Sequence, residues 1–226
     1  MQNVKNTMLD GLLSWLAPHP CISCGALGTL LCSYCKKYII GHKTRHCLWC
    51  NRPSRHGLCD LHVGDYYRAY WLGDRYGALQ TLVDDPKLRG RREASRVAAQ
   101  LLAAAFHIPP SAWLVPLPTS TKHVRMRGYD HTAALVYHVS RATGALARPI
   151  LQRARHFVQK DVSRAERFAQ VQGAFVVNEA LNPATLYILV DDVVTSGASA
   201  AEAARSLRAA GARQIWLLCI ARQPLD

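Results

Sequence analysis

Apolar and polar positions follow different patterns on the two sides of residue 65. Downstream, short apolar runs alternate with stretches whose apolar residues recur every three or four positions, which is typical of strands alternating with amphipathic helices. The runs predict strands over 66–72, 113–117, 174–177, 186–190 and 214–220, and the periodic stretches predict helices over 93–106, 131–142 and 200–210. Upstream, helical periodicity is weak and seven of the eight cysteines occur.

This alternation predicts the architecture of the larger part of the chain. Strands and helices in alternation form right-handed parallel units, so we expect an α/β fold with a parallel, Rossmann-like sheet over residues 66–226. Residues 1–65 would form a separate small module. Open sheets of this kind bind ligands beside the carboxyl ends of their strands, so the functional residues are expected there.

The best-defined of these strands ends in an acidic pair, Asp191 and Asp192. A loop of small and hydroxylated residues follows, and a helix begins directly after it. Loop amides and the positive end of a helix dipole favour a bound phosphate, and hydroxyls at Thr195, Ser196 and Ser199 add donors. Two carboxylates can accept hydrogen bonds from the vicinal hydroxyls of a sugar. The segment therefore predicts a site for a phosphorylated ribose; an acid pair that only caps a helix is the simpler alternative.

The upstream cysteines form regular pairs. Three Cys-x2-Cys pairs and one Cys-x2-His pair supply eight ligands: Cys21, Cys24, Cys32, Cys35, Cys47, Cys50, Cys59 and His62. Paired sulfurs on tight turns suit tetrahedral zinc, and four protein ligands leave no open position, so we expect two structural zinc sites. The short intervening loops favour sequential pairing, while interleaved pairing and a set of disulfides are the alternatives. So short a module buries little core, and its metals would supply most of its folding energy.

Composition and charge limit the expected partners and cellular location of the protein. Half of the 226 residues are hydrophobic, only 19% are charged, and the formal net charge is +13. Such a charge attracts polyphosphates or nucleic acid without sequence specificity. No apolar run reaches the length of a membrane span, and the short run before Pro18 does not predict a secretory signal. We therefore expect no membrane insertion and a reducing, cytoplasmic location, where clustered cysteines bind metal more often than they form disulfides.

Basic and aromatic residues alternate around the cysteine pairs. This combination suits single-stranded nucleic acid, whose bases stack on aromatic rings and whose phosphates meet cations. The residues are Lys36, Lys37, Lys43, Arg45, Arg52 and Arg55, with Tyr34, Tyr38 and Trp49. A solvated surface around a small fold is the alternative interpretation.

Two further basic segments lie in the larger part of the chain. Arg125, Arg127 and Gly128 follow the 113–117 strand, in a loop expected beside Asp191, where cations and exposed amides would meet a pyrophosphate group. The second segment carries three cations where a basic flap would close over a ligand and exclude water. These cations are Lys160, Arg164 and Arg167.

The segment 187–199 closely resembles the thirteen-residue phosphoribosyl-pyrophosphate (PRPP) signature of type I phosphoribosyltransferases. That signature consists of four apolar residues, two acids, two variable residues, Thr-Thr/Ser-Gly, a small residue and Thr, and Ser199 keeps the last hydroxyl. No P-loop and no GxGxxG pattern occurs. The resemblance implies binding of PRPP together with Mg²⁺. It assigns the site to Asp191, Asp192, Val193, Val194, Thr195, Ser196, Gly197, Ala198 and Ser199.

The chain as a whole resembles the competence protein F (ComF) family, which joins an N-terminal double zinc ribbon to a phosphoribosyltransferase domain. Residues 125–131 match the family's Arg-x-Arg-Gly-Phe-Asn-Gln, with Tyr129-Asp130-His131 at its end, and residues 159–175 match its Gln-to-Gly-Ala-Phe segment. The resemblance implies catalytic roles for Asp191, Asp192 and Arg127. It also implies a function in DNA uptake, natural transformation or DNA utilisation. Expected partners are PRPP, single-stranded DNA and a DNA-uptake helicase or processing protein.

Two classes of function remain open at this point. One is a PRPP- and DNA-binding protein without turnover. The other is an active phosphoribosyltransferase of nucleotide metabolism with an unidentified acceptor. Enzymes of this superfamily usually carry a hood segment that recognises the base, and no segment of this sequence can be assigned to one. The sequence therefore favours binding linked to DNA, or an unusual acceptor, over nucleobase salvage.

Overall fold

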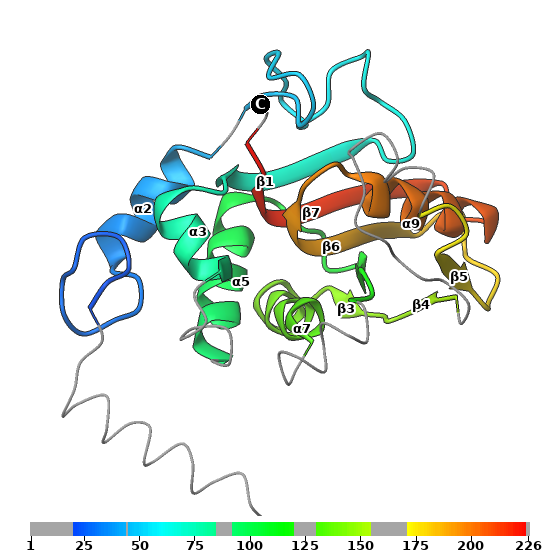
Figure 1. The fold of residues 1–226 in the computed structure, drawn as a ribbon. Helices are drawn as coiled ribbons and strands as arrows, with labels where there is room; N and C mark the ends of the chain where they lie inside the picture. Colours follow the sequence, from blue (N-terminus) through cyan, green and yellow to red (C-terminus); the bar gives the residue numbers. More distant parts are fainter. Residues whose placement is uncertain (1–19, 44, 85–91, 120–129, 155–170, 225–226) are drawn as a thin grey trace, which may run out of the picture.

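The computed structural model describes residues 20–43, 45–84, 92–119, 130–154 and 171–224. Within these ranges, strands and helices alternate along the chain as the apolar pattern predicts (Figure 1). The helices are α2 (Ser33–Gly41), α3 (Gly77–Asp84), α5 (Arg92–Ala105), α7 (His131–Thr143) and α9 (Ala198–Ala209). The strands are β1 (Arg68–Asp74), β2 (Trp113–Pro116), β3 (Leu146–Ala147), β4 (Leu151–Arg153), β5 (Phe175–Val177), β6 (Leu186–Val194) and β7 (Gln214–Arg222).

Five of the strands form one parallel sheet in the order β1-β7-β6-β2-β3. β4 and β5 form a separate antiparallel pair. The sheet confirms the expected α/β fold, because helices connect neighbouring parallel strands across both faces. The carboxyl ends of β6 and β2 are adjacent, since Val190 lies opposite Pro116 in the register. The segments that follow these two strands therefore begin at one edge of the sheet.

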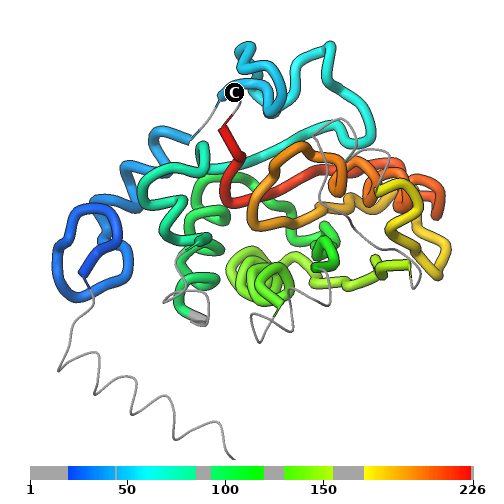
Figure 2. The backbone as a smooth tube through the Cα atoms, in the orientation of Figure 1, coloured from blue at the N-terminus to red at the C-terminus, as the bar shows by residue number. Residues whose placement is uncertain are grey.

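Two hydrophobic clusters lie on the two faces of the sheet. One contains the inward residues of α3, α5 and α7, such as Val97, Leu101 and Val139. The other contains those of α9, with Val171 and Phe175 from the neighbourhood of the β4–β5 pair. Figures 1 and 2 show α5 and α7 on one side of the sheet and α9 on the other. The apolar stripes of these helices thus bury themselves against alternate side chains of the same strands.

The N-terminal residues contribute to both clusters. Cys21, Leu31 and Cys35 are buried with α5, whereas Leu48 and Leu58 are buried on the α9 face. Figure 2 shows the chain passing from α2, beside α3 and α5, to a loop segment on the far side of β1. The division of the chain at residue 65 stays a prediction. The two sides of that division share their hydrophobic cores.

The second half of this segment covers the edge of β1. The Ala69 amide donates to the His56 carbonyl over 2.9 Å. Gly57 has φ +76°, and a Cβ there would lie 1.7 Å from the Ala69 carbonyl oxygen. Only glycine permits the loop to approach the strand this closely. The contact satisfies backbone groups that an exposed edge strand would leave open to other chains.

Most element boundaries differ from the sequence prediction by one or two residues, and β1 lies over 68–74 rather than 66–72. Two of the differences lie at the acidic pair. β6 continues to Val194 because β7 keeps pairing with it, with Val193 opposite Ala221 and Val194 opposite Arg222. α9 begins at Ala198 rather than at residue 200. The loop between them is therefore shorter than predicted, because Val193 and Val194 belong to the strand. The short elements α2, α3, β3 and β4 were not predicted, since none has enough residues to show a clear period.

No helix among the described residues is both long and apolar enough to span a bilayer.

Candidate functional site

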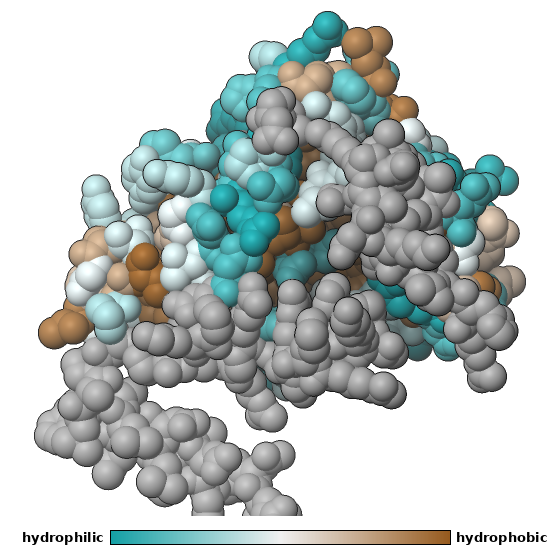
Figure 3. Space-filling model, in the orientation of Figure 1, coloured by the Kyte–Doolittle hydropathy of each residue, from teal (hydrophilic) through white to brown (hydrophobic). Residues whose placement is uncertain are grey.

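A cavity of about 320 Å³ lies at the carboxyl ends of β2 and β6. Its wall includes every residue from Asp191 to Ala200, together with Thr119, Thr132 and Arg153. The space-filling view of this face shows hydrophilic residues gathered around a hollow near the start of α9 (Figure 3). The volume falls in the range of sites for small-molecule ligands. The structure thus brings the predicted residues 191–199 together around one cavity.

The acidic pair forms one wall of this cavity. The Asp192 amide donates to Asp191 Oδ1 over 2.9 Å, and the Val193 amide donates to Asp192 Oδ1 over 2.8 Å. Burial raises the pKa of Asp191 well above its usual range, and the neighbouring charge of Asp192 raises this pKa further. The free site therefore holds a proton on Asp191 more readily than an exposed carboxylate would. A ligand that donates hydrogen bonds or carries cations would relieve this repulsion.

The β6–α9 loop, residues 195–197, leads into the first turn of α9. Gly197 is the N-cap of the helix, with φ +74°, and it supplies no side-chain hydrogen bond to the first turn. The Ser196 hydroxyl accepts from the Ala198 amide at 3.4 Å. The remaining amides of the first turn have no side-chain cap from Gly197, and the positive end of the helix dipole lies at the cavity wall. This arrangement suits a phosphate group.

Two cavity-lining arginines were missed from the sequence. Arg153 lies at the end of β4, where its Nε donates to the Pro118 carbonyl over 3.1 Å. Burial lowers the pKa of Arg153, and the charge of Asp191 opposes that shift. Arg75 pairs with Asp84 at 2.7 Å, and both residues line the cavity. The sequence signal for Arg153 was its place beside the predicted flap, but β4 is too short to be recognised as the strand that positions it.

Hydrogen bonds hold the described ends of both basic segments. Asp130 caps α7 by accepting from the Ala133 amide at 3.1 Å, and the same oxygen accepts from the Thr119 hydroxyl at 3.3 Å. Glu202 of α9 accepts from the Gly173 amide at 2.6 Å. The aspartate that replaces the family's asparagine thus serves as a helix cap, which either residue can do.

The basic residues of these segments lie outside the described ranges. They are Arg125, Arg127, Lys160, Arg164 and Arg167, and Gly128 lies outside these ranges as well. Their assignment to the ligand site stays a prediction.

The eight predicted metal ligands gather in two groups in sequential order. The first cluster is Cys21, Cys24, Cys32 and Cys35, and the second cluster is Cys47, Cys50, Cys59 and His62. In each group the ligand atoms lie within 4.8 Å of one another. This confirms sequential pairing and excludes the interleaved alternative. All of the described cysteines are free thiols, so the disulfide alternative is wrong as well.

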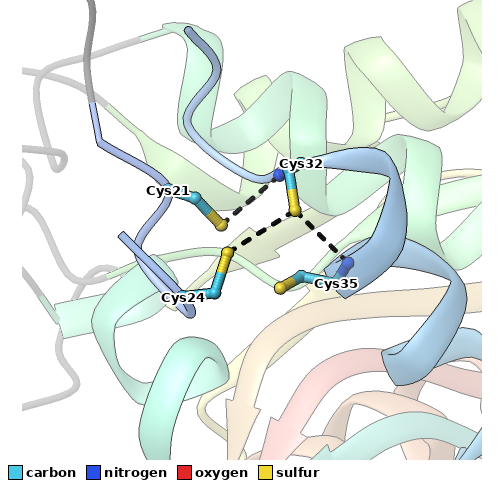
Figure 4. A group of neighbouring side chains, drawn as sticks. All are labelled: Cys21, Cys24, Cys32 and Cys35. Carbon is cyan, nitrogen blue, oxygen red and sulfur yellow. Dashed lines mark hydrogen bonds between the residues drawn. The ribbon is translucent and has the colours of Figure 1, made fainter. Parts of the chain in front are cut away.

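The geometry of the first cluster fits a tetrahedral ion (Figure 4). Cys24 Sγ and Cys32 Sγ lie 3.7 Å apart, close to the separation of about 3.8 Å that two Zn–S bonds of about 2.3 Å give at a tetrahedral angle. The Cys32 amide donates to Cys21 Sγ over 3.4 Å. Burial raises the pKa of Cys21, but backbone N–H groups outweigh it and bring the pKa to about 6. A thiolate held by amides is the form that binds metal.

The second cluster has a similar arrangement, with a histidine nitrogen in place of the fourth sulfur. Cys50 Sγ and Cys59 Sγ are 3.6 Å apart, and His62 Nδ1 is 3.2 Å from Cys59 Sγ and 3.5 Å from Cys47 Sγ. Three soft sulfurs and one imidazole suit zinc, and four ligands complete a structural site. We therefore expect zinc in both clusters, bound for structure rather than for catalysis.

Comparison with known proteins was made for the whole chain. No family model matches it. The DNA utilization protein YhgH of Escherichia coli strain K12 is 28% identical over 229 residues, covering 92% of this chain and 96% of its own. YhgH of Salmonella typhi is 26% identical over 206 residues, covering 84% and 89%.

This chain is therefore similar to YhgH over most of its length. The resemblance drawn from the sequence is thereby confirmed at the level of relatives that match most of its length. Among solved structures, the glutamine PRPP amidotransferase from B. subtilis complexed with ADP and GMP aligns at 16% identity, with a TM-score of 0.42. The alignment covers 62% of this chain and 30% of the amidotransferase chain. The fold itself rests on the sheet order and the cavity geometry given above.

One contact joins the second cluster to the cavity loop, and the sequence did not reveal it. The indole ring of Trp49, between ligands Cys47 and Cys50, lies against Gly197. A Cβ on Gly197 would approach Trp49 Cη2 to 2.0 Å, so the ring occupies the space of any larger side chain. Trp49 packs with the α9 face of the core and does not line the cavity. It therefore touches the loop from the side away from the ligand space.

Proposed function

We propose that this protein binds PRPP together with Mg²⁺ in the cavity at the start of α9, and that it does so as a phosphoribosyltransferase-like protein of DNA utilisation or uptake. One observation carries the proposal. An acidic pair and a helix N-terminus with glycine as its N-cap line the same cavity of about 320 Å³. Carboxylates suit the ribose hydroxyls and helix amides suit the 5-phosphate, so the two halves of the site match the two halves of one ligand.

Each residue has an assigned role in this proposal. Asp191 and Asp192 accept hydrogen bonds from the ribose hydroxyls. Thr195 to Ser199 hold the 5-phosphate through hydroxyls and amides, after the end of β6 at Val194. The pyrophosphate group is assigned to Arg125, Arg127 and the Gly128 amide. The described Arg153, which lines the cavity, is assigned to the same group. The flap cations are Lys160, Arg164 and Arg167.

Bound Mg²⁺ would neutralise part of the pyrophosphate charge. If turnover occurs, an acceptor forms a bond to the anomeric carbon while the bond from that carbon to the pyrophosphate oxygen breaks, and pyrophosphate leaves with the electron pair. Fixed cations such as Arg127 stabilise this leaving group most as its charge develops. Nothing among the described residues identifies an acceptor pocket, so an active transferase with an unidentified acceptor is the alternative function.

A second cavity supports binding of single-stranded DNA by the same protein. It measures about 460 Å³ and lies at the amino ends of β1 and β7. Its described lining contains no acidic residue. It includes the cations Lys43, Arg45, Arg55 and Arg68 and the aromatic residues Tyr70, Trp71, Phe106 and Trp216.

The cations and rings of this second cavity are arranged together. Lys43 Nζ lies 5.3 Å from the centre of the Phe106 ring, and Arg68 Cζ lies 4.7 Å from that of Trp216. Arg45 and Arg55 are exposed. Aromatic faces with adjacent cations are the combination that binds single strands without base specificity. The name of the relatives, DNA utilization protein, agrees with this assignment. A DNA-uptake helicase or processing protein as partner and a cytoplasmic location remain parts of the proposal.

Titration of the purified protein with PRPP and Mg²⁺ tests the main proposal. Asp191→Asn/Asp192→Asn should abolish binding, because amides cannot replace two carboxylates, whereas Asp60→Asn, an exposed acid of the second cysteine segment, should leave it unchanged. Wild-type affinity in the double variant would contradict the proposal. Release of pyrophosphate in the presence of nucleobases, nucleosides or DNA ends would distinguish an enzyme from a binder.

Titration with a fluorescent oligodeoxynucleotide tests the second part. Arg45→Glu/Arg55→Glu should weaken binding by about a hundredfold and flatten the salt dependence. Arg141→Glu/Arg213→Glu changes the net charge equally at exposed positions outside both cavities, and it should weaken binding far less. Equal losses in the two variants would show that only net charge attracts DNA.

A further inference from the structure

We propose that the second cluster controls the conformation of the β6–α9 loop, and that the indole ring of Trp49 transmits this control. Trp49 is then a positioning residue for the loop. The consequence for PRPP affinity rests on the proposed function, whereas the consequence for the loop itself does not.

The ring and the loop are matched in shape. A Cβ built on Gly197 would lie 2.0 Å from Cη2, 2.6 Å from Cζ2 and 3.0 Å from Cζ3 of Trp49. The outer edge of the indole therefore rests on the Gly197 backbone. Gly197 also has φ +74°, in the left-handed region that favours glycine. This residue is thus restricted twice, by its own torsion and by the ring that packs on it.

The cluster fixes the position of the ring. Trp49 lies between two ligands, Cys47 and Cys50, so coordination of one ion by both closes the short turn that carries it. Leu48, the other residue of this turn, is fully buried, and its amide donates to the Gly57 carbonyl over 2.8 Å. The direction of the indole therefore depends on the geometry of the turn and on the side-chain hydrogen bond between Trp49 and the buried Tyr66.

Arg222 clamps the same turn to the sheet. Its Nη1 donates to the Leu48 carbonyl at 3.0 Å and to Asn51 Oδ1 at 2.8 Å, and its Nη2 lies 2.7 Å from Asp74 Oδ1. Arg222 lies opposite Val194, the residue directly before the loop, in the β6–β7 register. The turn is thus tied to the sheet beside the start of the loop and pressed against its end. Two attachments of this kind leave the loop little freedom while the turn is closed.

Loss of the metal from the second cluster should release this constraint. Without ligation, Cys47 and Cys50 no longer hold the turn, and the ring can leave Gly197. The loop amides would then lose the fixed geometry that a phosphate requires, since a displacement of about 1 Å can cost about a hundredfold in a positioned interaction. Ligand binding would accordingly depend on the metal content of a cluster that contacts no ligand.

Hydrogen exchange of the metal-loaded full-length protein tests the loop directly. We expect Trp49→Ala to increase exchange at residues 195–200 and to weaken affinity for PRPP and Mg²⁺ by about tenfold to a hundredfold, with two metal ions per chain retained. Trp49→Phe should largely restore both. Trp113→Ala is the matched control, because Trp113 is a partly buried tryptophan that packs on the same core cluster away from the loop.

A double variant tests the contact itself. Gly197→Ala should abolish PRPP binding, because the new Cβ collides with the ring. In Gly197→Ala/Trp49→Ala the collision is gone, so the double variant should bind better than Gly197→Ala alone. Equal affinity of Gly197→Ala and the double variant would show that torsional strain alone restricts this position, and would overturn the proposed contact.

The outcomes separate this inference from the proposed function. Unchanged exchange at residues 195–200 in Trp49→Ala, or an equal increase in Trp113→Ala, would overturn the inference even if PRPP binds. A wild-type protein that binds no PRPP would refute the proposed function, and the exchange measurement would still decide whether Trp49 holds the loop. If Trp49→Ala fails to fold, the graded response of Trp49→Phe and the Gly197 pair decide the question.

Discussion

The two clusters have similar ligands, four sulfurs in the first and three sulfurs with one imidazole nitrogen in the second, but different neighbours. Both hold four soft ligands on paired short turns, with ligand atoms within 4.8 Å. The first cluster packs against the α5 face of the sheet, where Cys21 and Cys35 join the core cluster of α5 and α7. The second cluster packs on the α9 face, beside the loop that lines the proposed ligand site. The two clusters therefore differ in their position on the sheet, and we infer that this position sets their different roles.

This difference follows from the path of the chain around the edge strand. The first cluster is linked to α5 through α2, where Lys36 Nζ donates to Gln100 Oε1 over 3.0 Å. The chain then passes the edge strand β1 to the second cluster. There Arg222 of β7 bonds the turn of the cluster, and Trp49 of that turn contacts Gly197 at the start of α9. We therefore expect loss of a metal to act locally at the first cluster and, on the proposal above, to change ligand binding at the second.

Removal of one metal at a time should have the largest effect and test the comparison most directly. Cys47→Ser should cost the second metal and lower PRPP affinity by about a hundredfold or more. Cys24→Ser should cost the first metal and reduce the free energy of unfolding, while the protein that remains folded binds PRPP with nearly wild-type affinity. Metal analysis, denaturant unfolding and calorimetric titration of both variants provide the measurements.

Equal losses of PRPP affinity in the two cysteine variants would remove the distinction between the clusters. Each variant should first be confirmed to retain one metal ion per chain. A value near two ions would mean that serine or water replaces the sulfur, and Cys47→Ala and Cys24→Ala would then serve in their place.

Substitution of Arg222 should have the next largest effect. Arg222→Met keeps most of the side-chain volume but leaves two carbonyls, Asn51 and the Asp74 carboxylate without their buried donor. Loss of one member of a buried, hydrogen-bonded charge network costs about 3 kcal/mol in the free energy of unfolding. Urea unfolding measures this cost. Arg75→Met, which breaks the half-exposed pair with Asp84, is the matched control and should cost clearly less.

The residues that could be predicted from the sequence are those whose neighbours are close in the chain. The metal ligands follow from pairs three residues apart, and the Asp191–Ser199 segment follows from one strand, one loop and one helix start. Both are local arrangements, in which residue type and spacing nearly determine the geometry. The sheet could also be predicted, because alternation of strands and helices restricts the connections to parallel units.

The connections between these arrangements could not be predicted. Trp49 and Gly197 are far apart in the sequence, and no pattern at either residue indicated their contact. Arg222 has no pattern that would indicate its bonds to Leu48 and Asn51. Arg153 reaches the cavity from a strand of three residues, which is too short to show a period. Such contacts depend on how distant elements pack, and composition at either end does not specify that packing.

Substitution of Glu202 in α9 should have a smaller effect on the free energy of unfolding. It also tests whether the loop responds separately from the rest of this helix. Its two oxygens hold the Gly173 amide at 2.6 Å and Arg205 at 2.9 Å, and the residue is only 7% exposed. Glu202→Ala leaves a buried amide without its acceptor and should cost about 2 kcal/mol in the free energy of unfolding. Exchange at Gly173 should increase while exchange at Gly197 stays at its wild-type rate. An equal increase at Gly197 would mean that α9 responds as a whole, and that Trp49 has no separate influence on the loop.

The smallest effect on folding, with the opposite sign, is expected at the acidic pair. Because burial raises the pKa of Asp191, the folded protein binds its proton more strongly than the unfolded chain does. The stability that this proton provides is complete at low pH and is lost as pH rises through the raised pKa. Asp191→Asn should therefore increase the free energy of unfolding by about 1 kcal/mol above that range, with the difference vanishing in acid.

The same substitution separates stability from ligand affinity. Asp191→Asn should lose PRPP affinity while it gains stability, because the carboxylate that destabilises the free cavity is the group assigned to the ribose. In the wild type, affinity should increase with pH over the range in which Asp191 loses its proton, which thermal unfolding and titration at several pH values would measure. In Cys47→Ser, by contrast, stability and affinity should both decrease. A decrease of both in Asp191→Asn would instead indicate that the acid pair, like the second cluster, supports the structure of the loop.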